Sequence, residues 1–126
     1  MGTVLSHLIL DVHDVGRSLT FYTGLLGLAV CREDWFEGHR LAYLLAGSTE
    51  ILLVQQPEDP EHGPDARSGG VLLKFQVSNL VELAERVATQ EVNILRGMEG
   101  EVTGERSMLV ADPDGYAVLL SQTGSA

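Results

Sequence analysis

The stretch SMLVADPDGYAVLLSQ, residues 107–122, decides the fold of this chain. It consists of two short apolar runs joined by Asp112-Pro113-Asp114-Gly115. Proline presets the backbone for the second position of a turn and glycine tolerates positive φ, so the stretch predicts a tight β-hairpin. A second stretch, RLAYLLAGSTEILLV over residues 40–54, has the same plan. The chain is therefore expected to contain one module in two copies.

Strand and helix signals occur in the same order in both halves. In the first half they predict strands over residues 4–12, 28–33, 39–46 and 50–56 and a helix over residues 14–26, with a turn at residues 34–38. In the second half they predict strands over residues 71–77, 92–95, 106–111 and 116–122 and a helix that begins after residue 79. The predicted fold is α+β: two tandem βαβββ modules whose curved mixed sheets surround a concave pocket.

Length and composition predict one domain over residues 1–126, with modules at about 4–56 and 71–122 and a proline- and glycine-rich linker at 57–70. The chain begins without a basic, apolar leader and has no apolar run near the ~20 residues that a membrane span needs, so we expect a cytoplasmic protein. The lone cysteine, Cys31, forms no intrachain disulfide. The net charge of -10 argues against nucleic acid and anionic membranes as partners and mildly favours a cationic ligand.

Two runs carry a family resemblance: DVGRSLTFYTGLLG at residues 14–27 and ADPDGYAVLL at residues 111–120. With the order of elements, they resemble the vicinal oxygen chelate superfamily over nearly the whole chain. That superfamily includes glyoxalase I, methylmalonyl-CoA epimerase, extradiol dioxygenases, fosfomycin-modifying enzymes and antibiotic-binding proteins of the bleomycin-resistance type. The resemblance implies the fold and a homodimer. It leaves the activity open, because one fold hosts many chemistries.

The resemblance also implies four metal-ligand positions, two in each module. Counting from the motifs places them at His7, Leu52, Leu72 and Leu119. Leu53 replaces Leu52 if the strand register slips by one residue. Leucine has no donor atom, and a divalent ion needs several oxygen, nitrogen or sulfur donors. We therefore expect no metal and no other cofactor, while a displaced site using Asp11, His13 or Glu50 stays open.

An apolar pocket with a few polar groups remains. The candidate ligand-binding residues are His7, Trp35, Tyr43, Glu50, Leu52, Leu72, Lys74, Gln76, Arg106 and Leu119. His7 is either a general base or ligand contact, or a structural residue satisfied by a neighbour. Lys74 in mid-strand either serves the ligand or extends its charged end to water at the rim.

The remaining candidates also have two interpretations each. Phe36 is a candidate beside Trp35. Trp35 in the predicted turn stacks on a ligand or on a partner subunit. Tyr43 faces the pocket or the core. Arg106 binds an anionic group at the mouth or is a solvated strand-end residue, and the glycines of residues 97–104 before it suggest a flexible lid.

These residues favour a metal-independent protein that binds a small organic molecule, apolar or cationic and antibiotic-like. The alternative is a glyoxalase-like lyase, isomerase or cyclase that uses His7 as general base. A metal-dependent lyase or dioxygenase is third, because three of the four implied ligand positions are leucine. Neither the ligand nor the presence of turnover follows from the sequence.

Overall fold

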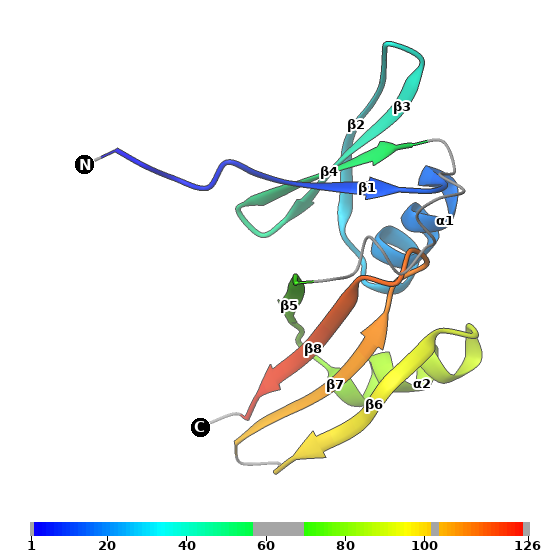
Figure 1. Cartoon of the computed structure of the whole chain (residues 1–126). Coiled ribbons are helices and arrows are strands. Elements are labelled where there is room, and N and C mark those ends of the chain that lie inside the picture. The colour runs from blue at the N-terminus through cyan, green and yellow to red at the C-terminus, as the bar shows by residue number, and fades with distance from the viewer. Residues whose placement is uncertain (1, 57–69, 102–103, 125–126) are drawn as a thin grey trace. The chain divides into compact units, whose positions relative to one another are not determined.

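The computed structural model describes residues 2–56, 70–101 and 104–124. The chain divides into two compact units, residues 1–61 (unit 1) and 62–126 (unit 2). Each unit contains one four-stranded mixed sheet with helical structure between its first and second strands (Figure 1). The predicted α+β fold of two tandem βαβββ modules is confirmed. All but the last residue of the predicted linker, 57–70, lies outside the described residues, and the union of both modules in one domain stays a prediction.

Unit 1 has the strand order β1-β4-β3-β2. Its elements are β1 (His7–Val12), α1 (Val15–Leu19), a π-helical turn η1 (Thr20–Leu25), β2 (Ala29–Phe36), β3 (His39–Ala46) and β4 (Thr49–Gln55). β1 pairs with β4 in parallel, and the other neighbours are antiparallel. The predicted helix start is confirmed, since the Asp14 carboxylate accepts a hydrogen bond from the Gly16 N–H at 2.8 Å.

The β2–β3 hairpin differs from the prediction. The sequence placed a turn over residues 34–38, but β2 continues through Trp35 to Phe36 and pairs with β3 to the end. The turn is confined to Glu37 and Gly38, with φ of 50° and 81°. Two successive positive φ values are typical of the tight hairpin turn that matches strand twist. Because β2 is regular here, the side chains of Trp35 and Phe36 point to opposite faces of the sheet.

Unit 2 repeats the topology, with the strand order β5-β8-β7-β6. Its elements are β5 (Leu72–Gln76), α2 (Leu80–Thr89), β6 (Asn93–Gly100), β7 (Glu105–Ala111) and β8 (Ala117–Thr123). The predicted turn before β8 is held by the buried Asp112 carboxylate, which accepts hydrogen bonds from the N–H groups of Asp114 and Tyr116. β6 is longer than predicted and includes residues 97–100 of the glycine-rich segment that the sequence suggested as a lid.

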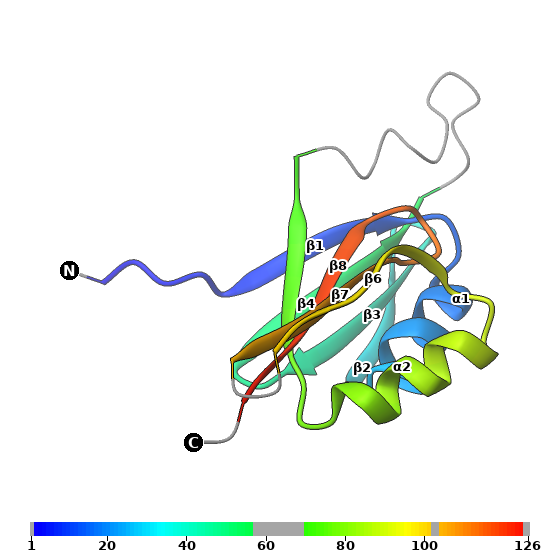
Figure 2. The same cartoon turned by 90° about the horizontal axis from the view of Figure 1, so that it is seen from below.

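Each helical segment covers one face of its own sheet (Figures 1 and 2). In unit 1, α1 contacts β3 and β4; in unit 2, α2 contacts β8. The buried strand residues on these covered faces include Leu10, Leu44, Ile51 and Leu53 in unit 1, and Leu73, Met108, Val118 and Leu120 in unit 2. In these strands the cores thus use alternate residues, which leaves the intervening residues for the opposite face of each sheet. The edge strands β2 and β6 contribute no buried residue.

Candidate functional site

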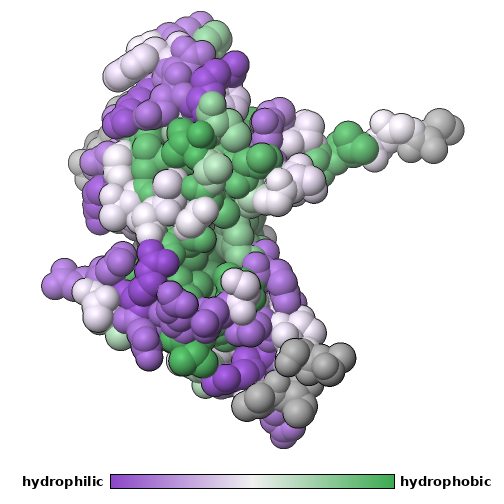
Figure 3. All heavy atoms as spheres, turned by 180° about the vertical axis from the view of Figure 1, so that it is seen from behind, coloured by the Kyte–Doolittle hydropathy of each residue, from purple (hydrophilic) through white to green (hydrophobic). Residues whose placement is uncertain are grey.

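The face of the unit 1 sheet opposite α1 carries a mixture of apolar and polar side chains. Strand pairing aligns Leu52 with Ile9 on one side and with Tyr43 on the other, and aligns Val54 with Asp11 and Leu41. The face therefore combines the apolar Ile9, Leu41, Leu52 and Val54 with the polar Asp11 and Tyr43. In the space-filling view, apolar atoms also gather on the visible side of unit 1, next to the mainly hydrophilic β2–β3 hairpin (Figure 3).

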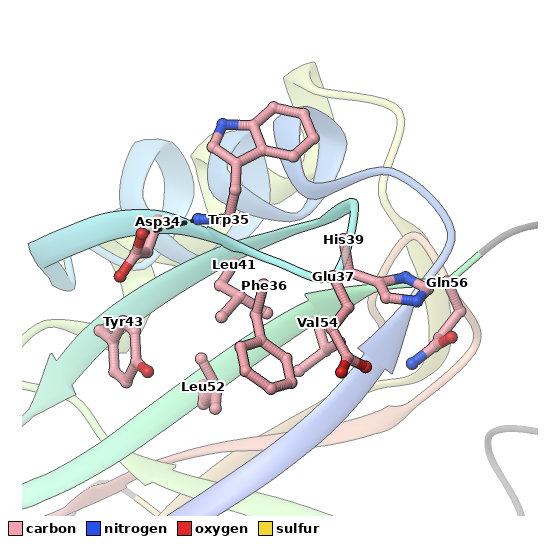
Figure 4. Close-up of a pocket in the computed structure, with 10 residues that line it drawn as sticks. All are labelled: Asp34, Trp35, Phe36, Glu37, His39, Leu41, Tyr43, Leu52, Val54 and Gln56. Atoms are coloured by element: carbon pink, nitrogen blue, oxygen red, sulfur yellow. Dashed lines mark hydrogen bonds between the residues drawn. The ribbon is translucent and has the colours of Figure 1, made fainter.

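A hollow of about 460 Å³ lies on this face at the β2–β3 hairpin (Figure 4). Its lining residues are Asp34, Trp35, Phe36, Glu37, His39, Leu41, Tyr43, Leu52, Val54 and Gln56. All of them belong to β2, β3, β4 and the residues that adjoin these strands. The volume falls in the range of pockets that accept small organic ligands, about 300–1,000 Å³.

Two neighbouring aromatic residues have different positions at this hollow. The ring of Phe36 lies over the floor formed by Leu52 and Val54, whereas the Trp35 ring lies on the other side of β2 and borders the hollow only at its rim (Figure 4). Both are strongly exposed, at 64% and 68%. The sequence pointed to both aromatic residues, but only Trp35 was retained among the ligand-binding residues, because the predicted turn hid the alternation of side chains along β2.

The ring of Tyr43 contributes a wall of the hollow and also contacts a cation. The guanidinium carbon of Arg32 lies 4.2 Å from the ring centroid. Such an arrangement is a cation–π interaction, in which the negative face of the ring attracts a positive charge. Of the two predictions for Tyr43, the structure places the residue at the hollow rather than in the core.

His7 and Glu50 lie on the same face as the hollow, in register with one another across β1 and β4. The His7 Nε2 atom is 2.5 Å from a Glu50 carboxylate oxygen, and His7 Nδ1 is 3.1 Å from the Ser6 hydroxyl. Both side chains of the pair are more than a third exposed. Glu50, one of the candidate ligand-binding residues, is therefore the neighbour that satisfies His7.

The donor set does not fit the metal centre that the resemblance implies. Unit 1 supplies His7 and Glu50, while Leu52, Leu72 and Leu119 have no donor atoms. Within residues 2–56, 70–101 and 104–124, no group of three or more His, Cys, Asp and Glu side chains is placed to hold an ion. Within the same ranges, the displaced site using Asp11, His13 or Glu50 also does not bring three such side chains together.

The corresponding face of the unit 2 sheet is crosslinked by polar pairs. The Lys74 ammonium group lies 3.2 Å and 3.3 Å from the two carboxylate oxygens of Glu105. The Gln76 amide donates to the Thr123 hydroxyl at 2.7 Å, and Arg96 donates to the Ser107 hydroxyl at 2.9 Å. Leu119, which is in register with Lys74, lies among these groups.

The Lys74–Glu105 pair has an electrostatic consequence. The hydrogen bond from Lys74 holds the pKa of Glu105 below its ordinary value of 4.5, and the adjacent Ser121 hydroxyl and the charge of Lys74 act in the same direction. Lys74 thus has a carboxylate partner as well as access to water. Glu105 was not a candidate, because it immediately precedes the predicted strand and only the β7–β8 register brings it near Lys74.

Arg106 differs from the other candidates of unit 2. It is in register with Gln122, and Gln122 accepts a hydrogen bond from the Leu80 N–H at the start of α2. Arg106 therefore points to the helix-covered side, where its guanidinium contacts the Met98 sulfur. The structure brings together His7, Glu50, Leu52 and Tyr43 on one face of unit 1, and Leu72, Lys74, Gln76 and Leu119 on one face of unit 2.

The order of elements and these sites define a class of protein. The sequence profile of the Glyoxalase/Bleomycin resistance protein/Dioxygenase superfamily matches residues 4–120, and the chain belongs to this superfamily. None of the helices in the described part of the chain combines the length and apolar character needed to cross a membrane.

Particular relatives span several activities. The metallothiol transferase FosB of Staphylococcus epidermidis is 26% identical over 94% of this chain and 80% of its own length. Among solved structures, Leishmania major glyoxalase I, described as trypanothione-dependent, is 25% identical with a TM-score of 0.72, over 96% of this chain and 87% of that one. TnmS3, an antibiotic binding protein from Streptomyces sp. CB03234, shares the fold with a TM-score of 0.72 at 19% identity, over 97% of both chains.

Proposed function

We propose that this chain is a metal-independent small-molecule-binding protein of the glyoxalase/bleomycin-resistance type, which holds an apolar or cationic organic ligand. The observation that carries this proposal is the hollow on unit 1, whose floor is formed by Leu41, Leu52 and Val54. Leu52 stands at a position where the resemblance implies a metal ligand. An apolar floor in that place supports burial of a ligand's apolar body instead of coordination of its oxygens.

The superfamily supports this class of function without selecting it. Its name joins enzymes with bleomycin resistance proteins, and the solved structures similar to this chain include an antibiotic binding protein. FosB and glyoxalase I are enzymes, so membership alone leaves catalysis open. The donor set, with His7 and Glu50 as its two members in unit 1, favours binding over metal chemistry.

Binding of an uncharged apolar dye such as Nile red, with metal content measured on the same sample by elemental analysis, tests the proposal. We expect saturable binding that resists a chelator, with less than one metal ion per chain. L52Q should weaken the dye about tenfold, because it replaces apolar floor by an amide. The control V81Q changes an exposed apolar residue of α2 and should leave binding unchanged. Stoichiometric metal that is lost in H7A, or dye binding equal in L52Q and the unaltered protein, would contradict the proposal.

The second candidate is an enzyme that uses His7 as general base. The contact of His7 with Glu50 favours it, because a carboxylate at one ring nitrogen orients an imidazole. Turnover of a ligand that disappears in H7A, persists in the presence of a chelator and is reduced in E50Q would establish this function. A ligand recovered unchanged after long incubation would favour the binding protein.

We also propose a homodimer that acts in the cytoplasm on a small organic ligand, without nucleic acid or membrane as partner. The exposed Val4, Leu5 and Ile9 before and within the edge strand β1 supply apolar surface that a second subunit would cover. Sedimentation equilibrium of the full chain distinguishes a dimer from a monomer.

A further inference from the structure

We infer that the hollow on unit 1 selects organic cations, namely ligands with a flat apolar body and a positively charged nitrogen. This inference rests on the proposed function, since it names the ligand class of the same hollow. An uncharged ligand would be consistent with the proposed function but not with this inference.

The floor of the hollow and the Phe36 ring above it would hold the apolar body of the ligand. Leu41, Leu52 and Val54 form the floor, and the Phe36 ring lies over Leu52 and Val54 (Figure 4). Phe36 is 64% exposed although it is large and apolar. A flat ligand between this ring and the floor would remove both from water, which is the largest favourable contribution available at this face.

The Tyr43 ring already binds a cation, the guanidinium group of Arg32. Arg32 places its guanidinium 4.2 Å from the ring centroid, on a ring that also lines the hollow. The quadrupole that attracts Arg32 attracts a ligand cation in the same way. Phe36 presents a second ring with the same property at the mouth.

Two carboxylates, those of Asp34 and Glu37, lie at the same mouth of the hollow. Asp34 lies on the strand position between Arg32 and Phe36, and Glu37 occupies the first position of the tight turn. Figure 4 shows the Glu37 carboxylate beside the Phe36 ring. Neither carboxylate has a cationic partner among the residues that the structure describes; the Asp34 oxygen accepts only the neighbouring Trp35 N–H there.

The remaining polar side chains of the hollow, His39 and Gln56, add no fixed positive charge. His39 donates from Nδ1 to the carbonyl oxygen of Gln55 at 3.0 Å, so in its neutral form Nε2 is an acceptor. Gln56 is uncharged, and its amide lies 3.4 Å from Asp11. The mouth therefore combines two carboxylates with two rings, which favours cations and repels anions.

The test uses two probes of equal shape and different charge: (1-naphthylmethyl)trimethylammonium and its uncharged carbon isostere, 1-neopentylnaphthalene. Calorimetric titration of the full chain at low ionic strength should give an affinity about tenfold higher for the cation. The double variant D34N/E37Q should reduce this preference to about twofold. In D34N the amide oxygen can still accept the Trp35 N–H, so the local backbone is preserved.

Two further variants separate local from general electrostatics. E33Q removes one negative charge from the opposite face of β2, half of the charge that D34N/E37Q removes. Glu33 pairs with Arg40 there, and E33Q should leave the preference unchanged. R32Q removes a competing cation from the Tyr43 ring and should increase the affinity for the charged probe about threefold.

The outcomes separate the two claims about the hollow. Equal affinities for the two probes in the unaltered protein, with both lowered by L52Q, would overturn the cation preference and leave the proposed hollow in place. A loss of preference in E33Q that is half of the loss in D34N/E37Q or greater would also overturn it, because the effect would then follow the net charge removed. Binding of neither probe would contradict both the ligand class and the hollow as a binding site.

Discussion

The two sheets share one topology but differ on the face that carries no helix. In unit 1 this face has a hollow with apolar floor residues, two aromatic rings and, at its rim, two carboxylates that have no cationic partner among the described residues. In unit 2 the corresponding face is bridged by Lys74–Glu105, Gln76–Thr123 and Arg96–Ser107. The strand orders β1-β4-β3-β2 and β5-β8-β7-β6 are equivalent, so topology does not produce this difference.

The difference shows that the fold and the ligand site depend on opposite faces of each sheet, which are formed by alternate residues of the same strands. The covered faces hold similar aliphatic residues in both units, because packing under a helix requires them. The other faces can diverge, since their side chains contribute less buried area. In unit 2 the polar groups of three pairs satisfy one another, which leaves fewer for a ligand. In unit 1 they border an apolar hollow, the combination that small-molecule sites show.

Substitutions at the adjacent residues Leu52 and Leu53 of β4 have the largest expected effect on stability. They test most directly whether the two faces of the unit 1 sheet have different roles. Leu53 is completely buried on the covered face, whereas its neighbour Leu52 lies half-buried in the floor of the hollow. L53A should lower the free energy of unfolding by about 2–5 kcal/mol through lost burial and a residual cavity. L52A should cost about half of that or less, because the site is already open to solvent. Urea denaturation of both variants measures the difference.

Equal destabilisation by L52A and L53A would show that the hollow is part of the core. The division between a structural and a functional face would then fail for unit 1. Binding of Nile red to L52A under native conditions supplies the complementary result, which should be weaker than binding to the unaltered protein.

Substitutions at the neighbouring aromatic residues Trp35 and Phe36 of β2 test the same distinction by ligand affinity instead of stability. Phe36 lies over the floor of the hollow, and the Trp35 ring lies on the other side of the strand. F36A should weaken binding of an apolar dye about fivefold, because one wall of its site is lost. W35A should change the affinity by less than about twofold. A larger loss in W35A would assign the ligand to the rim or to the opposite face of the hairpin.

Much of the fold could be predicted from the sequence because its signals are local. Asp14 and Asn79 both accept hydrogen bonds at their helix starts, and Asp112 holds its turn. The alternation of apolar residues identified the strands in the correct order. The errors occurred where composition suggested a turn or a flexible lid in place of a strand. Trp35 and Phe36 continue β2, and residues 97–100 continue β6, whose pairing with β7 has register shifts.

The site was less predictable because it depends on strand register. Glu50 is in register with His7, and Lys74 contacts Glu105, through pairings between strands that are distant in sequence. A shift of one residue in any strand would exchange the faces and separate these groups. Asp34 and Glu37 were missed, and Phe36 was not retained among the ligand-binding residues, for a related reason. Their common location depends on where β2 ends, and no local signal marked that residue.

The Lys74–Glu105 pair of unit 2 yields the smallest effect, because both side chains are about half exposed and water screens their attraction. K74M should raise the pKa of Glu105 toward 4.5, since it removes both the hydrogen bond and the positive charge that lower it. A carboxyl with a lowered pKa stabilises the folded state above its unfolded pKa, and this contribution disappears as pH falls through the folded value. K74M should therefore be less sensitive to acid over that window. Carbon-detected NMR titration of the Glu105 side chain measures the shift, with R86M on α2 as the charge-matched control. An unchanged pKa in K74M would mean that the pair is absent in solution, and unit 2 would then present a lysine and a carboxylate available to a ligand.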